Sequence, residues 1–125
     1  MHLGILKQAL KECEKSDMHP FRVGAVIFHG KRIMAYGHNK KQFPGSIHPK
    51  YRNEYPSLHA EQDAILKIQD WSKLSGVSML IVRTNANGNI SMAKPCEMCM
   101  SMIKHVGIKT IYYTNYESEI QKQKI

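Results

Sequence analysis

The sequence predicts an α/β fold in a single domain that spans residues 1–125, and three observations support this prediction. The hydrophobic content is 42% and the charged content 22%, which is typical of a chain with a packed core. The length of 125 residues lies in the commonest size range for one domain. From residue 58 onward, predicted helices alternate with predicted strands, as in parallel strands joined by crossover helices.

The first third of the chain predicts a helix followed by a hairpin. Apolar side chains at three- and four-residue spacing predict a helix over residues 2–16, with a stripe made of Leu3, Leu6, Leu10 and Cys13. Cys13 lies on that stripe and is expected to be a small buried apolar side chain. Residues 21–28 predict a strand buried on both faces, and residues 33–36 predict its hairpin partner. Gly24 either lets another group approach the strand closely or marks a bulge.

Residues 37–57 form a long polar connection that leads directly into the first metal-binding motif. A loop of this length in a small domain is usually functional or disordered, and its position favours a functional one. Its basic residues would either bind a phosphate or simply be solvated: Lys40, Lys41, Lys50 and Arg52. Tyr51 and Tyr55 would either stack on a base or pack over the mouth of the site.

The remainder predicts two helices and two strands. Residues 58–71 predict a helix with Ser57 as its N-cap, and residues 77–82 predict a central strand. Residues 84–94 are rich in turn formers. Pro95, at the favoured first helical position, opens a helix over residues 96–106. Residues 108–113 predict the last strand, and the tail from Tyr116 is expected to form a short helix with a frayed end.

Two short stretches carry the chemistry: His59-Ala60-Glu61 and Pro95-Cys96-Glu97-Met98-Cys99. One imidazole and two thiolates are enough to hold a zinc ion, and three protein ligands leave open the fourth position that a catalytic site needs. Cys96 and Cys99 are three residues apart, so one helical turn points both sulfurs the same way. In the first turn of a helix, the dipole would help to keep these thiolates ionised.

Glu61 lies two residues after His59 and therefore points to a different side of the predicted helix. It can sit beside the ion without binding it, take a proton from zinc-bound water and pass it to a substrate. The alternative is a structural zinc knuckle, which usually needs a second Cys or His pair nearby, and the sequence has none. The odd count of three cysteines likewise favours metal over disulfides.

The net charge of +8 favours anionic partners, either nucleotides or nucleic acid, although it would also serve solubility alone. No apolar run is long enough to cross a membrane, so no membrane partner is expected. The N-terminus lacks a basic stretch followed by an apolar one, so no signal peptide is expected. We therefore expect a cytoplasmic, reducing location.

The pattern H-A-E followed by P-C-E-M-C resembles the zinc-dependent cytidine deaminase superfamily, whose signature is H-x-E…P-C-x-x-C. The resemblance implies a three-layer α/β/α sandwich, a mixed central sheet with helices on both faces. It implies Zn²⁺ as cofactor on His59, Cys96 and Cys99, attack of zinc hydroxide on the amine-bearing carbon of a cytosine or adenine ring, and loss of ammonia. Glu61 would be the catalytic proton carrier.

The resemblance also suggests which residues contact the substrate. Asn39 matches an asparagine that such enzymes place after their second strand, although it would equally fit an ordinary turn. Ala60, Lys40 and Tyr55 complete the expected substrate contacts. A homo-oligomer, at least a dimer, is expected on the same ground.

Two branches of the superfamily compete. The stretches over residues 59–65 and 99–113 resemble deoxycytidylate deaminases, whereas residues 23–26 and the basic charge also suit tRNA adenosine deaminases. The chain departs from both, because the stretch after Asn39 lacks the expected glycine- and proline-containing run and the chain ends before the usual fifth strand. The leading hypothesis is a deaminase of a cytosine nucleotide or nucleoside, with a dCMP-like substrate favoured. The alternatives are a nucleic-acid deaminase and an inactive zinc-stabilised binding module.

Overall fold

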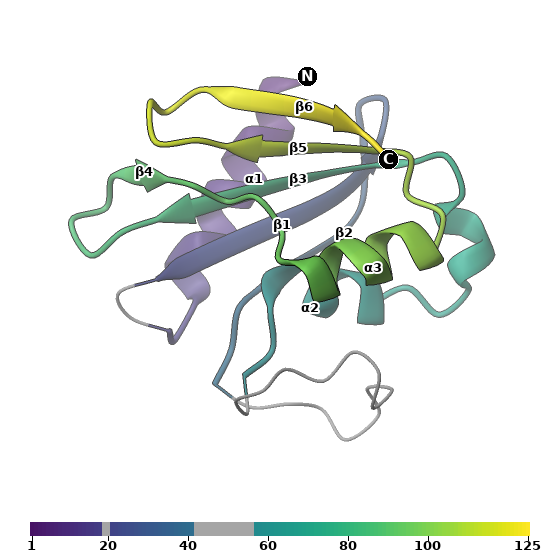
Figure 1. Ribbon diagram of the computed structural model, residues 1–125, viewed down its shortest axis with the longest axis horizontal. Coiled ribbons are helices and arrows are strands. Elements are labelled where there is room, and N and C mark those ends of the chain that lie inside the picture. The colour runs from purple at the N-terminus through teal and green to yellow at the C-terminus, as the bar shows by residue number, and fades with distance from the viewer. Residues whose placement is uncertain (19–20, 42–56) are drawn as a thin grey trace.

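The computed structural model describes residues 1–18, 21–41 and 57–125 and contains helices and strands in mixed order (Figure 1). In chain order these elements are α1 (Leu3–Lys15), β1 (Arg22–His29), β2 (Arg32–His38), α2 (Ala60–Leu66), the 3₁₀ helix η2 (Trp71–Leu74), β3 (Ser78–Thr84), β4 (Ile90–Ser91), α3 (Glu97–His105), β5 (Thr110–Thr114) and β6 (Ile120–Lys124). None of the helices within these ranges is long and apolar enough to cross a membrane.

The strands form one mixed sheet. Its order is β2-β1-β3-β5-β6, and the short strand β4 pairs with the end of β3. β3 and β5 are parallel and are joined by α3, as the alternation of helix and strand predicts, whereas the other described pairs are antiparallel. The predicted hairpin is β1–β2.

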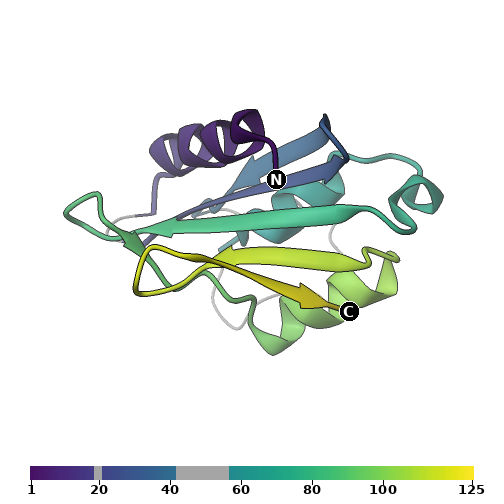
Figure 2. The same ribbon diagram turned by 90° about the horizontal axis from the view of Figure 1, so that it is seen from above.

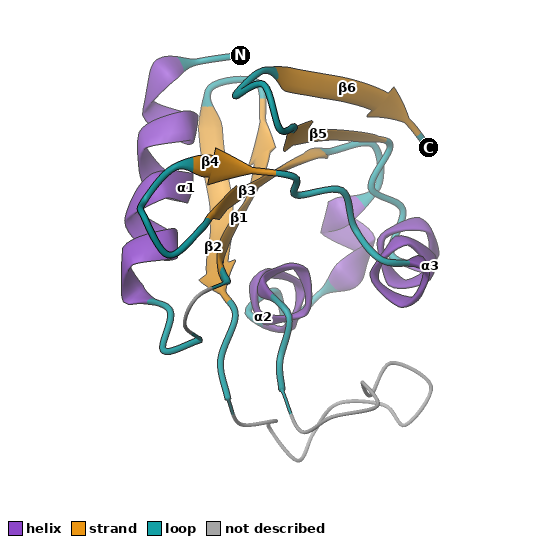
Figure 3. Ribbon diagram, turned by 60° about the vertical axis from the view of Figure 1, so that its left-hand side comes forward, coloured by secondary structure: helices purple, strands orange, loops and turns teal. Residues whose placement is uncertain are grey.

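Helices cover both faces of this sheet, which confirms the predicted three-layer sandwich. α1 lies on one face, and α2 and α3 lie on the other (Figures 2 and 3). The alternation of side chains along β3 separates two cores. Met79 and Ile81 pack in the core under α2 and α3, while Leu80 and Val82 pack in the core under α1. Cys13 belongs to the second core and is 2% exposed, and burial raises the pKa of its thiol to about 11.

Two glycines let helices approach the sheet from opposite sides. A Cβ atom at Gly24 would lie 2.2 Å from the carbonyl oxygen of Ala9 in α1. A Cβ atom at Gly37 would lie 2.5 Å from the backbone nitrogen of Ala64 in α2. Of the two interpretations open for Gly24, close approach of another group is therefore the one that holds.

Two predicted elements have different bounds or types. The helix predicted over residues 58–71 ends at Leu66 and is followed by η2. Its N-cap is His59 and not Ser57. The predicted C-terminal helix is wrong, because residues 120–124 form β6, which pairs with β5 and completes a path of five strands. The expectation that the chain ends before a fifth strand is wrong for the same reason.

Two smaller corrections concern helix ends. Pro95 is not the first helical residue, because Cys96 is the N-cap of α3 and the proline precedes it. Leu3 does not continue the buried stripe of α1 and is 62% exposed. The buried residues of α1 are instead Ile5, Ala9, Glu12 and Cys13, so the stripe includes a carboxylate that an apolar pattern does not show.

Candidate metal centre and active-site pocket

His59 lies at the N-cap of α2, with its backbone in an extended conformation. Its backbone N–H donates to the side-chain oxygen of Gln62 at 2.9 Å. The Gln62 side chain is almost fully buried, at 1% exposed. This bond satisfies one of the free N–H groups near a helix start and fixes the direction in which the His59 imidazole leaves the backbone.

The two cysteines lie in the first turn of α3. Cys96 is the N-cap and is exposed, whereas Cys99 is three residues further along and is fully buried. Pro95, itself buried, leads the chain into this turn. The predicted arrangement, with both sulfurs on one turn at a helix start, is present.

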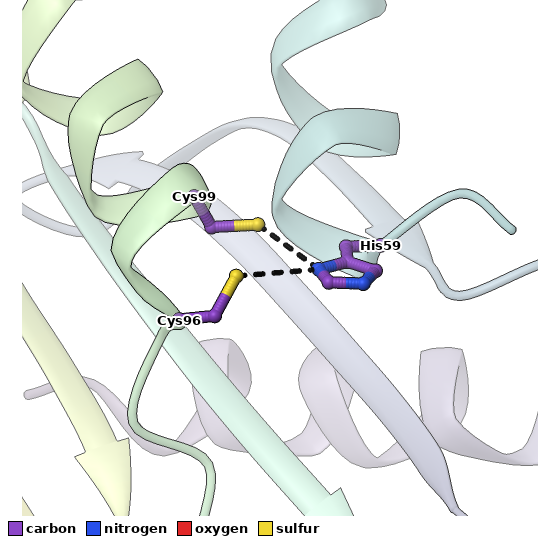
Figure 4. A group of neighbouring side chains, drawn as sticks. All are labelled: His59, Cys96 and Cys99. Atoms are coloured by element: carbon purple, nitrogen blue, oxygen red, sulfur yellow. Dashed lines mark hydrogen bonds between the residues drawn. The ribbon is translucent and has the colours of Figure 1, made fainter. Parts of the chain in front are cut away.

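His59, Cys96 and Cys99 lie together at the starts of α2 and α3 (Figure 4). One ligand atom from each lies within 4.8 Å of the other two. The Nδ1 atom of His59 is 3.1 Å from the Cys99 sulfur and 3.8 Å from the Cys96 sulfur. Tetrahedral zinc with ordinary bond lengths separates a nitrogen and a sulfur ligand by about 3.6 Å, a value between these two distances. The donor set and its spacing therefore fit zinc, with Nδ1 as the nitrogen ligand.

Hydrogen bonding shifts the titration of the two thiols in opposite directions. Hydrogen bonds from Cys99 and His59 lower the pKa of the Cys96 thiol to about 3. The hydrogen bond to Cys96 and burial raise the pKa of the Cys99 thiol. The hydrogen bond with Cys96 also raises the pKa of the His59 imidazole. A cation bound between the three groups would displace the protons that they hold in its absence.

Glu61 stands next to this group without being part of it. The three described residues that can hold a metal are His59, Cys96 and Cys99, and the Glu61 carboxylate is a separate group 6% exposed. Burial raises the pKa of this carboxyl, and the charge of His59 only partly opposes that rise. A carboxyl that is held beside a metal centre with its pKa raised toward neutrality can take a proton and give it back.

A cavity of about 310 Å³ opens beside the centre. His59, Glu61 and Cys96 line it from the two helix starts. The other described lining residues come from the ends of β1, β2 and β3 and from the segments next to β4 and α2: Met18, Phe21, Val23, Asn39, Ser57, Leu58, Ala60, Arg83, Met92, Ala93 and Lys94. A cavity of this volume lies at the lower end of the range for small-molecule sites.

The predicted substrate contacts occupy different places. Asn39 and Ala60 both line the cavity. The Asn39 side chain accepts from the backbone N–H of Val23 and donates to the carbonyl of Phe21, so it also holds the wall together. Lys40 is outside the described lining and pairs with Asp63 at 3.1 Å. Tyr55 lies outside the described residues, as do Lys50, Tyr51 and Arg52.

Three residues of the site were not predicted. Gln62 supports His59, and its signal was its position three residues after an N-cap, where a side-chain acceptor commonly closes a capping box. Arg83 and Lys94 add two cationic side chains to the cavity lining. The signal of Arg83 was its place as the first charged residue after the apolar run that became β3.

Comparison with protein families decides the relationship. The model of the cytidine and deoxycytidylate deaminase zinc-binding region matches residues 2–115. The chain belongs to this family. As a family member, it carries the zinc-binding region, and His59, Cys96 and Cys99 are positioned to coordinate the ion.

Solved structures agree with this family fold. Cytidine deaminase from Burkholderia pseudomallei has a TM-score of 0.70 at 17% identity, covering 99% of this chain and 92% of the other. The dCMP deaminase from the cyanophage S-TIM5 has a TM-score of 0.55 at 26% identity in its apo form, covering 93% and 86%. The same enzyme in complex with dCMP and dUMP has a TM-score of 0.56 at 25% identity, covering 93% and 85%. Comparison with curated protein sequences finds no match.

Proposed function

We propose that this member of the deaminase family hydrolyses the amino group of a cytosine nucleotide or nucleoside, with a dCMP-like substrate favoured. One observation carries the proposal: a buried carboxylate, Glu61, stands beside a three-ligand zinc site in a cavity of about 310 Å³. A purely structural zinc site has no use for such a neighbour. The cyanophage dCMP deaminase at 25–26% identity supports the choice of a nucleotide.

The reaction replaces the exocyclic amine of cytosine with an oxygen from water and yields a uracil product and ammonia. Zinc held by His59, Cys96 and Cys99 would act as a Lewis acid that lowers the pKa of water toward neutrality. Glu61 takes a proton from the attacking water and returns it to the substrate as the amine leaves. Because Glu61 is buried, bulk water does not compete for that proton.

The remaining residues of the cavity orient the base. Ala60 lies between His59 and Glu61 in the chain and lines the cavity with them. We therefore assign it a contact with a base that reaches both residues. Asn39 lines the same cavity just after β2, and we assign to the sugar or the base edge the one amide N–H that its hydrogen bonds within the wall leave over. Lys40 and Tyr55, from the chain between β2 and α2, stay proposed contacts.

The test is a product screen on zinc-loaded protein with dCMP, deoxycytidine, cytidine, dCTP, a single-stranded oligodeoxynucleotide and tRNA. Mass spectrometry detects the loss of one amine, and an ammonia assay confirms it. Turnover of dCMP or a cytosine nucleoside, but not of RNA or DNA, supports the proposal. Turnover of tRNA or the oligodeoxynucleotide alone would replace it with a nucleic-acid deaminase, and binding without turnover would indicate an inactive module.

The expected oligomer, at least a dimer, and the cytoplasmic location stay predictions. Light scattering of the purified protein tests the oligomeric state.

A further inference from the structure

Arg83 occupies a distinctive place at the end of β3. Residues of β3 alternate between the two faces of the sheet, and Met79 and Ile81 face α2 and α3. Arg83 follows in the same alternation and is therefore on the face that carries the metal ligands. It is paired with Val23 of β1 on one side and Ser91 of β4 on the other, and it lines the cavity.

The partly buried Arg83 side chain has no carboxylate partner within the part of the chain that the structure describes. Its Nε atom is buried without a hydrogen-bond partner in the described structure. No salt bridge among residues 1–18, 21–41 and 57–125 includes Arg83. The ring of Phe21 lies 4.3 Å from its central carbon and holds the guanidinium plane in place. A phosphate bound in the cavity would supply the negative charge that the described structure does not place beside this side chain.

The described lining of the cavity contains more cationic than acidic side chains. Arg83 and Lys94 are the cationic side chains of the described lining besides the imidazole of His59, and Glu61 is its acidic one. Glu61 lies beside the metal centre, so its end of the cavity would receive the reacting base. Arg83 and Lys94 have no carboxylate partner among the described salt bridges. They would therefore suit a substrate that carries a negatively charged group as well as the reacting base. A planar guanidinium offers paired N–H donors that match phosphate oxygens.

We propose that Arg83 binds the 5′-phosphate of a mononucleotide substrate and makes the chain select nucleotide over nucleoside, with Lys94 adding charge at the cavity edge. This inference rests on the proposed deaminase function and adds its specificity determinant. The cavity volume of about 310 Å³ accommodates one nucleotide and favours a free monophosphate over a strand of nucleic acid.

The experiment compares kcat/KM for dCMP and for deoxycytidine in the native protein and in Arg83→Gln. The native protein is expected to prefer dCMP. Arg83→Gln should lose about 10- to 100-fold in kcat/KM for dCMP, the effect of a charge-assisted hydrogen bond, and should lose much less for deoxycytidine, so that the preference for dCMP falls. Deoxycytidine turnover thus reports that the variant is folded and that its metal centre is intact. Arg83→Lys, which keeps the charge but loses the fork, should recover only part of the preference.

Arg22 offers a matched control. Its Nε atom is also buried without a hydrogen-bond partner in the described structure, but it lines a different cavity, beside α1. Arg22→Gln should leave the ratio between dCMP and deoxycytidine unchanged. Equal losses for both substrates in Arg83→Gln, a native preference for the nucleoside, or preferential turnover of an oligodeoxynucleotide would each overturn the assignment.

A binding measurement separates this inference from the proposed function. Calorimetric titration of the zinc-loaded protein with dUMP and with deoxyuridine needs no turnover. Tighter binding of dUMP that is lost in Arg83→Gln supports the phosphate site even if no substrate is deaminated. Equal affinities for dUMP and deoxyuridine would overturn the phosphate site even if deamination of both dCMP and deoxycytidine is observed.

Discussion

At the scale of single residues, the proposed function gives Glu61 a role in proton transfer and the three ligands a role in metal binding. His59, Cys96 and Cys99 converge on one point, whereas Glu61 is buried beside them and is not one of the three. In the proposed mechanism, metal binding and proton transfer therefore depend on different side chains. Substitutions can separate the two roles, which makes the assignment of Glu61 directly testable.

We predict that Glu61→Gln keeps about one zinc per chain, because it removes no ligand. Its kcat should fall by about 10²- to 10⁴-fold, the usual contribution of a positioned general acid–base group. Metal analysis by mass spectrometry and an ammonia assay measure the two quantities. As the reference, Cys99→Ala should lose both metal and activity. Zinc loss in Glu61→Gln would show that the carboxylate is a ligand.

Gln62 supports a ligand through the backbone, and its removal should weaken metal binding indirectly. Gln62→Ala leaves the His59 N–H without its acceptor at 2.9 Å. We expect a loss of about 1–3 kcal/mol in the free energy of unfolding and a fall in zinc affinity of about 10- to 100-fold. Competition with a chelator measures the affinity, and denaturation measures stability. The exposed Gln69, after the same helix, provides the control Gln69→Ala, and equal affinities in the two variants would contradict this role.

At the scale of elements, helix starts set the positions of all three ligands. α2 begins after His59 and α3 begins after Cys96, so each ligand comes from the N-cap or the first turn of a helix. Close contact of α2 with the sheet depends on Gly37, and close contact of α1 depends on Gly24. The distances of α1 and α2 from the sheet therefore depend on these two positions having no Cβ atom.

Gly24→Ala is expected to destabilise the protein strongly. The added Cβ would lie 2.2 Å from the Ala9 carbonyl oxygen, and that oxygen belongs to helix backbone that cannot rotate away. We expect at least about 1–3 kcal/mol of lost stability, the range for overpacked cores, measured by thermal or urea unfolding. In Gly4→Ala the nearest atom is Nδ1 of the exposed His2 ring at 3.1 Å, which can shift. That variant should be neutral or more stable, and equal effects in the two variants would refute the packing argument.

The sequence predicted the elements that have a clear period and missed those that depend on their neighbours. The apolar run at residues 77–82 became the centre of the sheet, and the C-x-x-C spacing placed both sulfurs on one helical turn. The sequence of β6, Ile-Gln-Lys-Gln-Lys, has little strand propensity and does not predict a strand. These residues form a strand because they pair with β5. Arg83 was missed because its value comes from the cavity and not from any local pattern.

At the scale of the whole molecule, one polar network joins both helical layers through the end of β2. The His38 ring contacts the Glu12 carboxylate of α1 at 3.1 Å, and its backbone N–H donates to Asp63 of α2 at 3.0 Å. Lys15 pairs with Glu12 at 2.8 Å. Burial opposes ionisation of Glu12, but hydrogen bonds and charges from Lys15 and His38 outweigh it, and the pKa lies below its usual value of 4.5.

This lowered pKa predicts a specific acid sensitivity. A carboxylate whose pKa is lower in the folded state stabilises the fold fully above pH 4.5, and the contribution is lost as pH falls through the folded value. Glu12→Gln should therefore be less stable at neutral pH by about 1–3 kcal/mol. Its stability should also fall less steeply below pH 4.5, as urea unfolding at several pH values would show. Glu14→Gln, at an exposed site of the same helix, is the control, and parallel curves for native protein and Glu12→Gln would rule out this linkage.

The metal centre has a consequence for the unfolded chain as well. His59 and Cys96 are 37 residues apart in sequence, so an ion bonded to both closes a ring that contains α2, η2, β3 and β4. For a covalent cross-link of this span, the chain-entropy treatment gives about 4 kcal/mol of stabilisation. Zinc would act here as a reversible cross-link. Loss of the ion would then release the ring, and the cavity wall formed by β3 and β4 would lose its restraint together with the reaction centre.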